Sequence, residues 1–285
     1  SGVEEKGKAE AALKKAIAID PQRVKPHMAA AAFFDANGQQ EMAENHYKKA
    51  LEIQPDNIGV LDTVARRLFR QQNLPEAKQY VEKALAIKPD YAPTRILNGE
   101  ILLAENKYDE AAEVFDKLVK EDPQSALAHY FKAVAHIGKS ETGSAKTALL
   151  RAVELDPKLI RAKLLLASIY LQEQAYDLAE KESREVLEMS PGIFQAHLIF
   201  GNACMYQQKK EAAKNAFETL IKLEPENPVG YYRLGILNQA LKQTNLARAN
   251  FEKALELNPM LMDVFAALIK TEVLSGNADA ALERC

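Results

Sequence analysis

The sequence lacks tryptophan altogether, and only two of its 285 residues are cysteines. Cys204 and the terminal Cys285 are too few for the disulfide framework of a small secreted domain, so that class is excluded. No apolar run reaches the roughly 18 residues of a membrane-spanning helix. An excess of one charge is also absent: 37 basic and 40 acidic residues leave a net charge of -3. A general attraction to nucleic acid is therefore not expected.

Residues 92–125 show how the chain is organised. Apolar residues at three- and four-residue steps over 96–103 predict the buried side of a helix. Asn106 can adopt the left-handed conformation that ends a helix, and Asp109 can cap the helix that follows. Pro123 stops this second helix because proline lacks the N–H and clashes with the preceding turn. The stretch is therefore predicted to be a helix, a tight turn and a second helix.

This unit is repeated along the whole chain. Eight prolines stand 34 residues apart, at Pro21, Pro55, Pro89, Pro123, Pro157, Pro191, Pro225 and Pro259. A small side chain held in the same register predicts where two helices touch, because a larger residue would overpack the contact. Alanine keeps this register at Ala9, Ala43, Ala77, Ala111, Ala145, Ala179, Ala213, Ala247 and Ala281.

The period and these positions resemble the tetratricopeptide repeat (TPR) family. The clearest copy of its signature is Tyr231, Leu234, Gly235, Ala247, Phe251 and Pro259. The resemblance implies an all-α, right-handed superhelical solenoid of antiparallel helix pairs. Two features depart from the family pattern: tryptophan is missing, and alanine replaces the usual glycine at Ala65, Ala133 and Ala167.

We expect a single TPR solenoid over residues 1–285. It is predicted to begin with a half repeat over 3–19 and to end with a truncated repeat over 262–285. Because both ends fall within a repeat, we also expect a fragment of a longer array, or ends that self-associate. The full repeats are predicted at 24–57, 58–91, 92–125, 126–159, 160–193, 194–227 and 228–261.

The turns between paired helices differ in sequence. Gly38 suits the left-handed conformation that such a turn needs. Gly138–Gly143 is the most irregular of these turns, and we expect a looser loop there, with a kink as the alternative. The other turns place Gln72, Asn106, Gln174, Gln208 and Lys242 at this position, at some cost in strain.

Patterns of catalytic or cofactor chemistry are weak. A phosphate-binding loop at Gly138 would need a second glycine at position 133, where Ala133 stands, and a strand leading into it. His129 and His136 are two helical turns apart, which does not fit a helix-borne metal site. The acidic residues lie at helix starts and on solvated faces. We therefore predict a non-enzymatic protein with no cofactor and no metal.

In the TPR family the first helices of successive repeats line a concave groove, and the resemblance assigns this role to part of each repeat here. A contiguous apolar lining is typical of a binding surface. The lining predicted to bind a peptide comprises Ile96, Glu100, Leu103, Leu127, Tyr130, Val134, Ile137, Arg161, Leu164, Leu171, Leu198, Asn202, Met205, Tyr232, Arg233 and Ile236. Three cations near the start of the groove form a candidate contact for an acidic segment: Lys25, Arg66 and Arg70.

The sequence thus predicts a protein–protein interaction scaffold that binds a peptide or helix of another protein. The chaperone-docking and sugar-transferase subtypes of the family are not favoured, because Leu97, Phe131, Leu165 and Ile199 occupy a position that these subtypes need for polar residues. Family analogy suggests bacterial envelope, polysaccharide export or secretion assemblies. The alternatives are a regulatory arm of an enzyme and a scaffold that self-assembles through its ends. Cytoplasm and periplasm both stay open.

Overall fold

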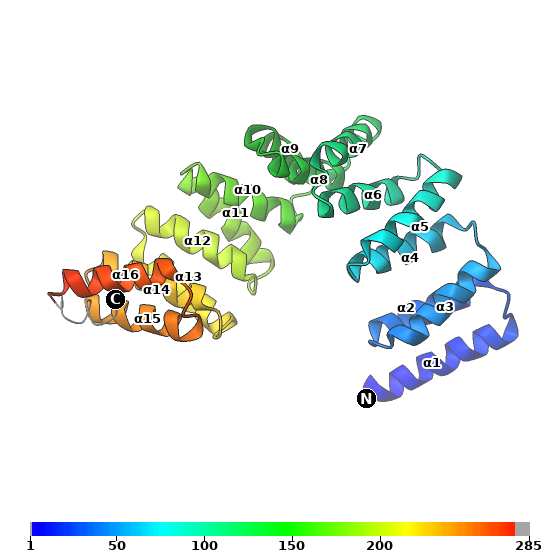
Figure 1. Ribbon diagram of the computed structural model, residues 1–285, viewed down its shortest axis with the longest axis horizontal. Coiled ribbons are helices and arrows are strands. Elements are labelled where there is room, and N and C mark those ends of the chain that lie inside the picture. The colour runs from blue at the N-terminus through cyan, green and yellow to red at the C-terminus, as the bar shows by residue number, and fades with distance from the viewer. Residues whose placement is uncertain (1, 277–285) are drawn as a thin grey trace. The chain divides into compact units, whose positions relative to one another are not determined.

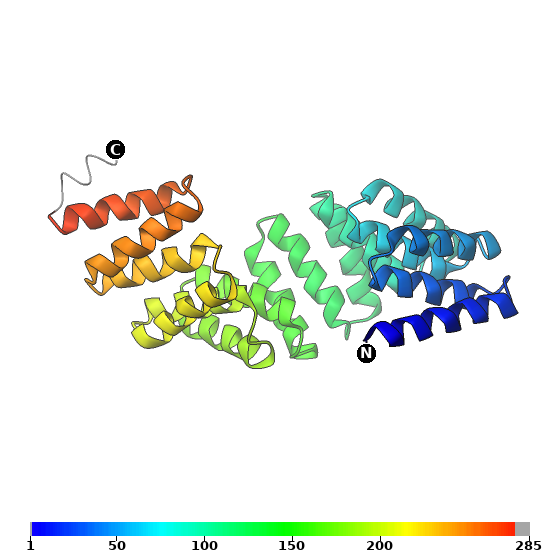
Figure 2. The same cartoon turned by 90° about the horizontal axis from the view of Figure 1, so that it is seen from below.

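The computed structural model describes residues 2–276, and within them it contains sixteen α-helices and no strand (Figures 1 and 2). Helix α1 (Gly2–Ile19) is followed by helices of alternating 13 and 14 residues. The chain divides into two compact units, Ser1–Glu141 and Thr142–Cys285.

The first unit contains α1 and the helices that form three pairs, followed by one further helix. Within each pair the two helices pack against each other, and successive pairs also touch. The helices after α1 are α2 (Val24–Ala36), α3 (Gln40–Ile53), α4 (Ile58–Arg70), α5 (Leu74–Ile87), α6 (Ala92–Ala104), α7 (Tyr108–Glu121) and α8 (Ala126–Gly138).

The second unit follows the same plan within the described residues. Helix α10 packs on α11, α12 on α13 and α14 on α15, and α16 packs on α15. The helices of this unit are α9 (Thr142–Leu155), α10 (Ile160–Gln172), α11 (Tyr176–Met189), α12 (Phe194–Tyr206), α13 (Lys210–Leu223), α14 (Pro228–Ala240), α15 (Thr244–Leu257) and α16 (Met262–Leu274).

The turns between paired helices each contain one residue in the left-handed region, as predicted. Gly38 has φ of 73°, and Gln72, Asn106, Gln174, Gln208 and Lys242 have φ between 59° and 63°. The looser loop predicted at Gly138–Gly143 is wrong. Ser140, with φ of 60°, takes the left-handed position of an ordinary turn. Gly138 instead belongs to the last turn of α8, and the ring of Tyr108 occupies the space that a β-carbon would need there.

The alanine register marks the contact between paired helices for most of the chain. Ala43, Ala77, Ala111, Ala179, Ala213 and Ala247, which lie on second helices of pairs within one unit, are all fully buried, and Ala145 of α9 is buried as well. Ala9 was predicted to pack in the same way, but it is exposed. At this position alanine packs against the first helix of its own pair, and no helix precedes α1 in the described residues. Ala281 lies outside those residues.

Asp109 does not cap a helix as predicted. Lys107 is the N-terminal cap residue of α7, and no side chain there accepts a hydrogen bond. Asp109 lies in the first turn, where its charge is favourable beside the positive helix end. Its carboxylate also pairs with Lys139 at 2.9 Å.

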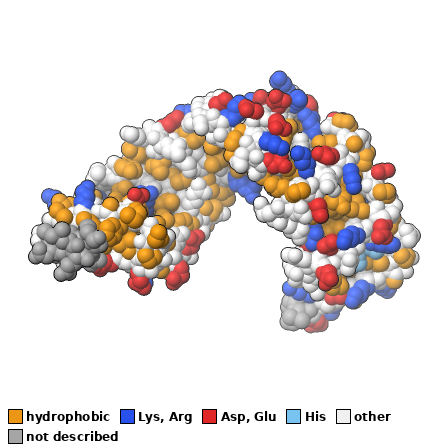
Figure 3. Space-filling model, in the orientation of Figure 1, with side chains coloured by type: hydrophobic (Ala, Val, Ile, Leu, Met, Phe, Trp, Pro, Cys, Tyr) orange, Lys and Arg blue, Asp and Glu red, His pale blue; other side chains and the backbone are white. Residues whose placement is uncertain are grey.

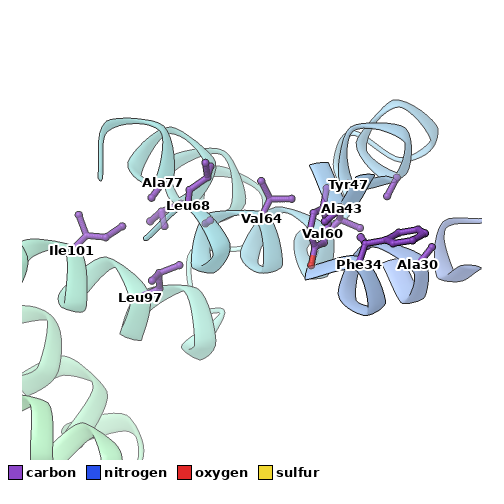
Figure 4. Close-up of a cluster of buried hydrophobic side chains, with 14 residues drawn as sticks. Ala30, Phe34, Ala43, Tyr47, Val60, Val64, Leu68, Ala77, Leu97 and Ile101 are labelled. Carbon is purple, nitrogen blue, oxygen red and sulfur yellow. The ribbon is translucent and has the colours of Figure 1, made fainter. Parts of the chain in front are cut away.

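The core of the first unit is continuous from α2 to α6. Phe34 and Tyr47 of the first pair meet Val60 and Val64 of α4, and Leu97 of α6 extends the same cluster (Figure 4). All five side chains are buried. Each pair therefore completes the core of its neighbour, which explains why one repeat alone could not bury its apolar face.

Three histidines that share one repeat position tie first helices to the preceding turn. In each case ring atom Nε2 lies within hydrogen-bond distance of the carbonyl oxygen of the proline six residues earlier. This contact was not predicted from the sequence. The pairs are His27 with Pro21 at 3.1 Å, His129 with Pro123 at 3.2 Å and His197 with Pro191 at 2.8 Å.

Candidate peptide-binding surface

The first helices of the first unit carry ten of the predicted site residues. Leu127 and Ile137 of α8 are each 39% exposed, which is high for large apolar side chains. Lys25 and Arg70 are also exposed. The remaining six are half-buried: Arg66, Ile96, Glu100, Leu103, Tyr130 and Val134.

Several of these side chains contribute to the core as well as to the surface. Ile96, Leu103 and Tyr130 pack against a buried cluster that contains Phe115 and Phe131. The ring of Tyr130 meets the ring of Phe131 edge to face, with centroids 5.0 Å apart. Each of these residues therefore presents only part of its side chain to a ligand.

Arg66 is tied to its neighbours and is not free to bind a partner. Its Nε donates to Asp62 at 2.9 Å, and it also donates to the carbonyl of Pro93. Asp62 in turn accepts from the hydroxyl of Thr94 at 2.8 Å, which links α4 to α6. Glu100 lies 3.8 Å from the guanidinium. By contrast, Lys25 and Arg70 form no ion pair within residues 2–276.

The first helices of the second unit carry the other nine predicted residues. Only Arg161 of α10 is exposed, and only Asn202 of α12 is buried. Figure 3 shows hydrophobic side chains over the visible face of this unit, with few charged side chains between them. The half-buried members are Leu164, Leu171, Leu198, Met205, Tyr232, Arg233 and Ile236.

Four of these apolar side chains rest on the unit's core. Leu198 and Met205 pack against the cluster around Phe217, and Tyr232 and Ile236 pack against the cluster around Phe251. We call these four residues the apolar surface of the second unit. Their inner atoms are held by the core, so the exposed parts are presented in fixed positions.

Two polar groups beside this surface have no partner. The Oδ1 of Asn202 and the Nε of Arg233 are buried and make no hydrogen bond within the described residues. The guanidinium of Arg233 lies 5.5 Å from the ring centroid of Tyr232. A buried polar atom without a partner costs free energy, because it has lost its hydrogen bonds to water.

A pocket of about 340 Å³ opens at the α14 end of the apolar surface. Two methionines beside the α15–α16 turn dominate it: Met260 is 82% exposed and Met262 is 71% exposed. We call it the methionine pocket; its lining is Pro228, Val229, Tyr232, Met260, Leu261, Met262, Asp263 and Val264.

Neither methionine is among the residues predicted from the sequence, although one signal could have revealed them. Position 260 follows the registered proline, and the equivalent positions in earlier repeats hold only polar residues or glycine, such as Asp56, Gln124 and Glu226. Met260 breaks that pattern. An apolar residue where all other repeats are polar or glycine points to a local function.

Elsewhere the described residues show little reactive chemistry. Burial raises the pKa of the Cys204 thiol to about 11, so this thiol is inert at neutral pH. No group of three His, Cys, Asp or Glu side chains within residues 2–276 could hold a metal ion. None of the helices in that range has the length and apolar character needed to cross a bilayer.

Family models for the tetratricopeptide repeat match residues 68–135 and, separately, residues 27–57, 160–193, 194–227 and 229–259. Together they cover more than half of the chain. The chain belongs to the tetratricopeptide repeat family. The predicted all-α solenoid of TPR helix pairs is thereby confirmed. A search of curated proteins found no match.

Solved structures share the fold at low sequence identity. YrrB, described as a TPR protein with an unusual peptide-binding site, is 19% identical with a TM-score of 0.59, over 66% of this chain and 96% of YrrB. Cut9–Hcn1 of the APC/C is 15% identical with a TM-score of 0.70, over 92% of this chain and 52% of that one. The pilF protein of Pseudomonas aeruginosa is 16% identical with a TM-score of 0.65, over 73% and 94%.

Proposed function

We propose that this TPR chain is a non-enzymatic scaffold that binds a peptide or helix of another protein along its first helices. The observation that carries the proposal is the methionine pocket beside the apolar surface of the second unit. Met260 and Met262 are the most exposed methionines of the described residues, and Tyr232 joins the pocket to that surface. Exposed apolar groups of this kind are characteristic of interaction sites.

The chemistry of the lining suits a segment with one or two apolar anchors. Methionine side chains are flexible and polarisable, so they can fit aliphatic and aromatic anchors of different shapes. Burying about 400 Å² of apolar surface would contribute roughly 10 kcal/mol before the costs of association. Those costs remove much of the gain, and an affinity in the micromolar range is expected.

The unpartnered polar groups would orient the segment. Both atoms are buried, so each side chain has to turn toward the ligand first; Oδ1 of Asn202 would then accept a hydrogen bond from a peptide N–H, and Nε–H of Arg233 would donate one to a peptide carbonyl. Such bonds read the backbone and not the side chains, so they would fix the direction of the segment while the apolar anchors select its sequence. Further contacts would come from the other predicted site residues of the second unit, such as Leu164 and Leu171.

The test begins with a random peptide library displayed on phage and selected on the wild-type chain. The selected peptide is then titrated by fluorescence anisotropy into two variants that add the same charge to exposed residues of the second unit. Met262→Glu places the charge in the methionine pocket and should weaken binding by at least about ten-fold, because the charge must be desolvated when the peptide covers it.

The matched control is Leu246→Glu, on the second helix α15, where the side chain is 55% exposed and outside the pocket. It should change the affinity by less than about two-fold, and circular dichroism should show both variants folded. If Met262→Glu binds as tightly as the wild type, or if no peptide is selected, the proposal is wrong.

A further inference from the structure

A second pocket, of about 470 Å³, lies in the first unit between α2, α3 and α4. It differs in chemistry from the methionine pocket, because its only apolar side chains besides the tyrosine ring are two alanines. We call it the arginine pocket, and its lining is Ala32, Asp35, Ala36, Gln40, Tyr47, Thr63, Arg67, Arg70 and Gln71.

The floor of the arginine pocket is a satisfied ion pair. Arg67 is only 6% exposed, and its Nε donates to Asp35 at 3.0 Å while a terminal nitrogen donates to the carbonyl of Gln40 at 3.2 Å. The hydroxyl of Tyr47 donates to the other oxygen of Asp35 at 3.1 Å. Arg67 therefore neutralises Asp35, and these contacts use two of its five N–H donors.

Arg70 supplies the unbalanced charge of the pocket. It lies one turn beyond Arg67 on the same face of α4, and Thr63 and Gln71 share that face at helical spacing. No ion pair or hydrogen bond engages the Arg70 side chain within residues 2–276. The nearby Glu44 is taken by Lys48 at 2.6 Å. With Asp35 neutralised, the pocket carries one net positive charge.

Hydrogen-bond donors outnumber acceptors in the arginine pocket, just as positive charges outnumber negative ones. Arg70 and the unused N–H groups of Arg67 point to a ligand with two adjacent acceptor oxygens, since a guanidinium and a carboxylate match in geometry. The amides of Gln40 and Gln71 add further donors at the rim. The hydroxyl of Thr63 already donates to the carbonyl of Gly59 at 2.7 Å, so it offers no donor.

We propose that the arginine pocket binds the carboxylate of an Asp or Glu side chain on a partner peptide, through Arg70 and the unused N–H groups of Arg67. This inference rests on the proposed function, because it assigns the pocket to a segment of another protein. It also revises the predicted acidic contact. Arg70 keeps that role, Arg66 is consumed by Asp62 and Pro93, and Lys25 does not line the pocket.

The experiment uses two synthetic probes, acetyl-(Ala-Glu)₃-amide and acetyl-(Ala-Gln)₃-amide. Each is titrated to millimolar concentration into the ¹⁵N-labelled full chain, and the arginine Nε–H and backbone signals are followed by NMR. The glutamate probe should produce saturable shifts at Arg70, Arg67 and Gln71 that weaken as salt rises from 50 to 300 mM, because an exposed ion pair is screened. The glutamine probe should leave these signals unchanged.

Two variants then separate the pocket from general charge. Arg70→Gln should weaken binding of the glutamate probe by about five-fold or more, and Arg70→Lys should lie between it and the wild type because lysine lacks the planar fork. Arg23→Gln removes the same charge from an exposed residue at the other end of α2. Along the helix axis, Arg23 is about 18 Å from Asp35 of the pocket, at about 1.5 Å of rise per residue. This control should weaken binding by less than about two-fold.

The proposal is overturned if Arg70→Gln and Arg23→Gln weaken binding equally, or if the glutamine probe binds as well as the glutamate probe. It is also overturned if the glutamate probe shifts only signals of the second unit. The apolar peptide selected on the wild type should bind Arg70→Gln, which keeps the methionine pocket intact. If the glutamate probe does not bind the wild-type chain while the apolar peptide still does, this inference is rejected and the proposed function stands.

Discussion

A β-carbon on Gly235 would lie 2.5 Å from Cε1 of Phe251, so the phenylalanine ring occupies the space that any other residue at position 235 would need. The same relationship joins Gly99 to Phe115 and Gly201 to Phe217. In each pair the phenylalanine follows the glycine by 16 residues. A glycine in the first helix and a large ring in the second are thus two halves of one contact.

The alanines that replace this glycine have a counterpart in the second helix. The residues 16 positions after Ala65, Ala133 and Ala167 are Val81, Leu149 and Ser183, all smaller than phenylalanine. Ala31, which is followed by Tyr47, is the exception. What looks in the sequence like a departure from the TPR pattern is therefore a volume exchange between paired helices, since a packed core tolerates swaps that conserve total volume.

Replacing glycine by alanine should change the free energy of unfolding in opposite directions at Gly235, where a ring fills the space, and at Gly143, where the space is open. Gly235→Ala should lower the free energy of unfolding by about 1–3 kcal/mol, because the new methyl group overlaps the ring of Phe251. Gly143→Ala, in helix α9 with no atom within 4 Å of the added carbon, should raise it by about 0.5–1 kcal/mol. Urea unfolding measures both. Adding Phe251→Leu to Gly235→Ala should recover part of the loss, and strictly additive effects would argue against the contact.

A pair of histidines predicts acid sensitivity in the first unit. Nδ1 of His46 lies 3.2 Å from Nδ1 of His27, and the ring of His46 stacks on Phe34. Burial, and then the neighbouring His27, lower the pKa of His46 below its usual value near 6.5. Only one proton fits between the two Nδ1 atoms, so one ring donates through Nδ1 and the other accepts.

The direction of the pH dependence of stability follows from the lowered pKa of His46. The unfolded chain binds a proton at His46 more readily than the folded chain, so stability is present above pH 6.5 and is lost as the pH falls through the folded pKa. Chemical unfolding at pH values from 7.5 to 5.5 should therefore show a smaller decrease for His46→Phe, which keeps the stack on Phe34. Parallel profiles for the variant and the wild type would contradict this assignment.

Lys163 is expected to contribute strongly to stability, at a repeat position where five of the other seven residues are histidine or aromatic and the remaining two are Leu61 and Arg95. It is only 3% exposed, and its ammonium group binds Glu182 at 2.9 Å and also Glu185. Burial lowers its pKa, but the hydrogen bonds to Glu185 and Glu182 outweigh burial and raise it overall. The lysine thus stays charged and compensates the buried Glu182.

Removing that ammonium group leaves a buried carboxylate without a partner. Lys163→Met should lower the free energy of unfolding by about 2–4 kcal/mol, measured by urea unfolding at pH 7. The double variant Lys163→Met with Glu182→Gln should be more stable than the single variant, because the uncompensated charge is gone. A single variant as stable as the wild type would show that the ion pair contributes nothing.

Most of the turns between paired helices could be predicted from the sequence. The left-handed residue was predicted at Gly38, Asn106 and their counterparts because the 34-residue register places them between two helices. The register alone would also have selected Ser140. Two glycines nearby suggested a loose loop instead. Only the structure shows that Gly138 lies inside the helix and that the ring of Tyr108 fills the space of a β-carbon there.

The exposure and ion pairing of the candidate binding residues could not be predicted from the sequence. Family resemblance placed candidate residues on first helices, but Asn202 is buried while Leu127 of the same helix class is 39% exposed. Arg66 and Arg70, one turn apart, look equivalent in the sequence. The structure shows that they differ, because Arg66 donates hydrogen bonds to Asp62 and Pro93 while Arg70 lines the arginine pocket.

The sequence by itself determined the helices, the repeat length and the family. These depend on local spacing and on small side chains that recur every 34 residues. Exposure, ion pairing and the two pockets were decided by the tertiary structure. They depend on which side chains from different helices compete for the same space and the same hydrogen bonds, as Tyr108 does at Gly138 and Asp62 does at Arg66. A one-dimensional pattern carries no record of that competition.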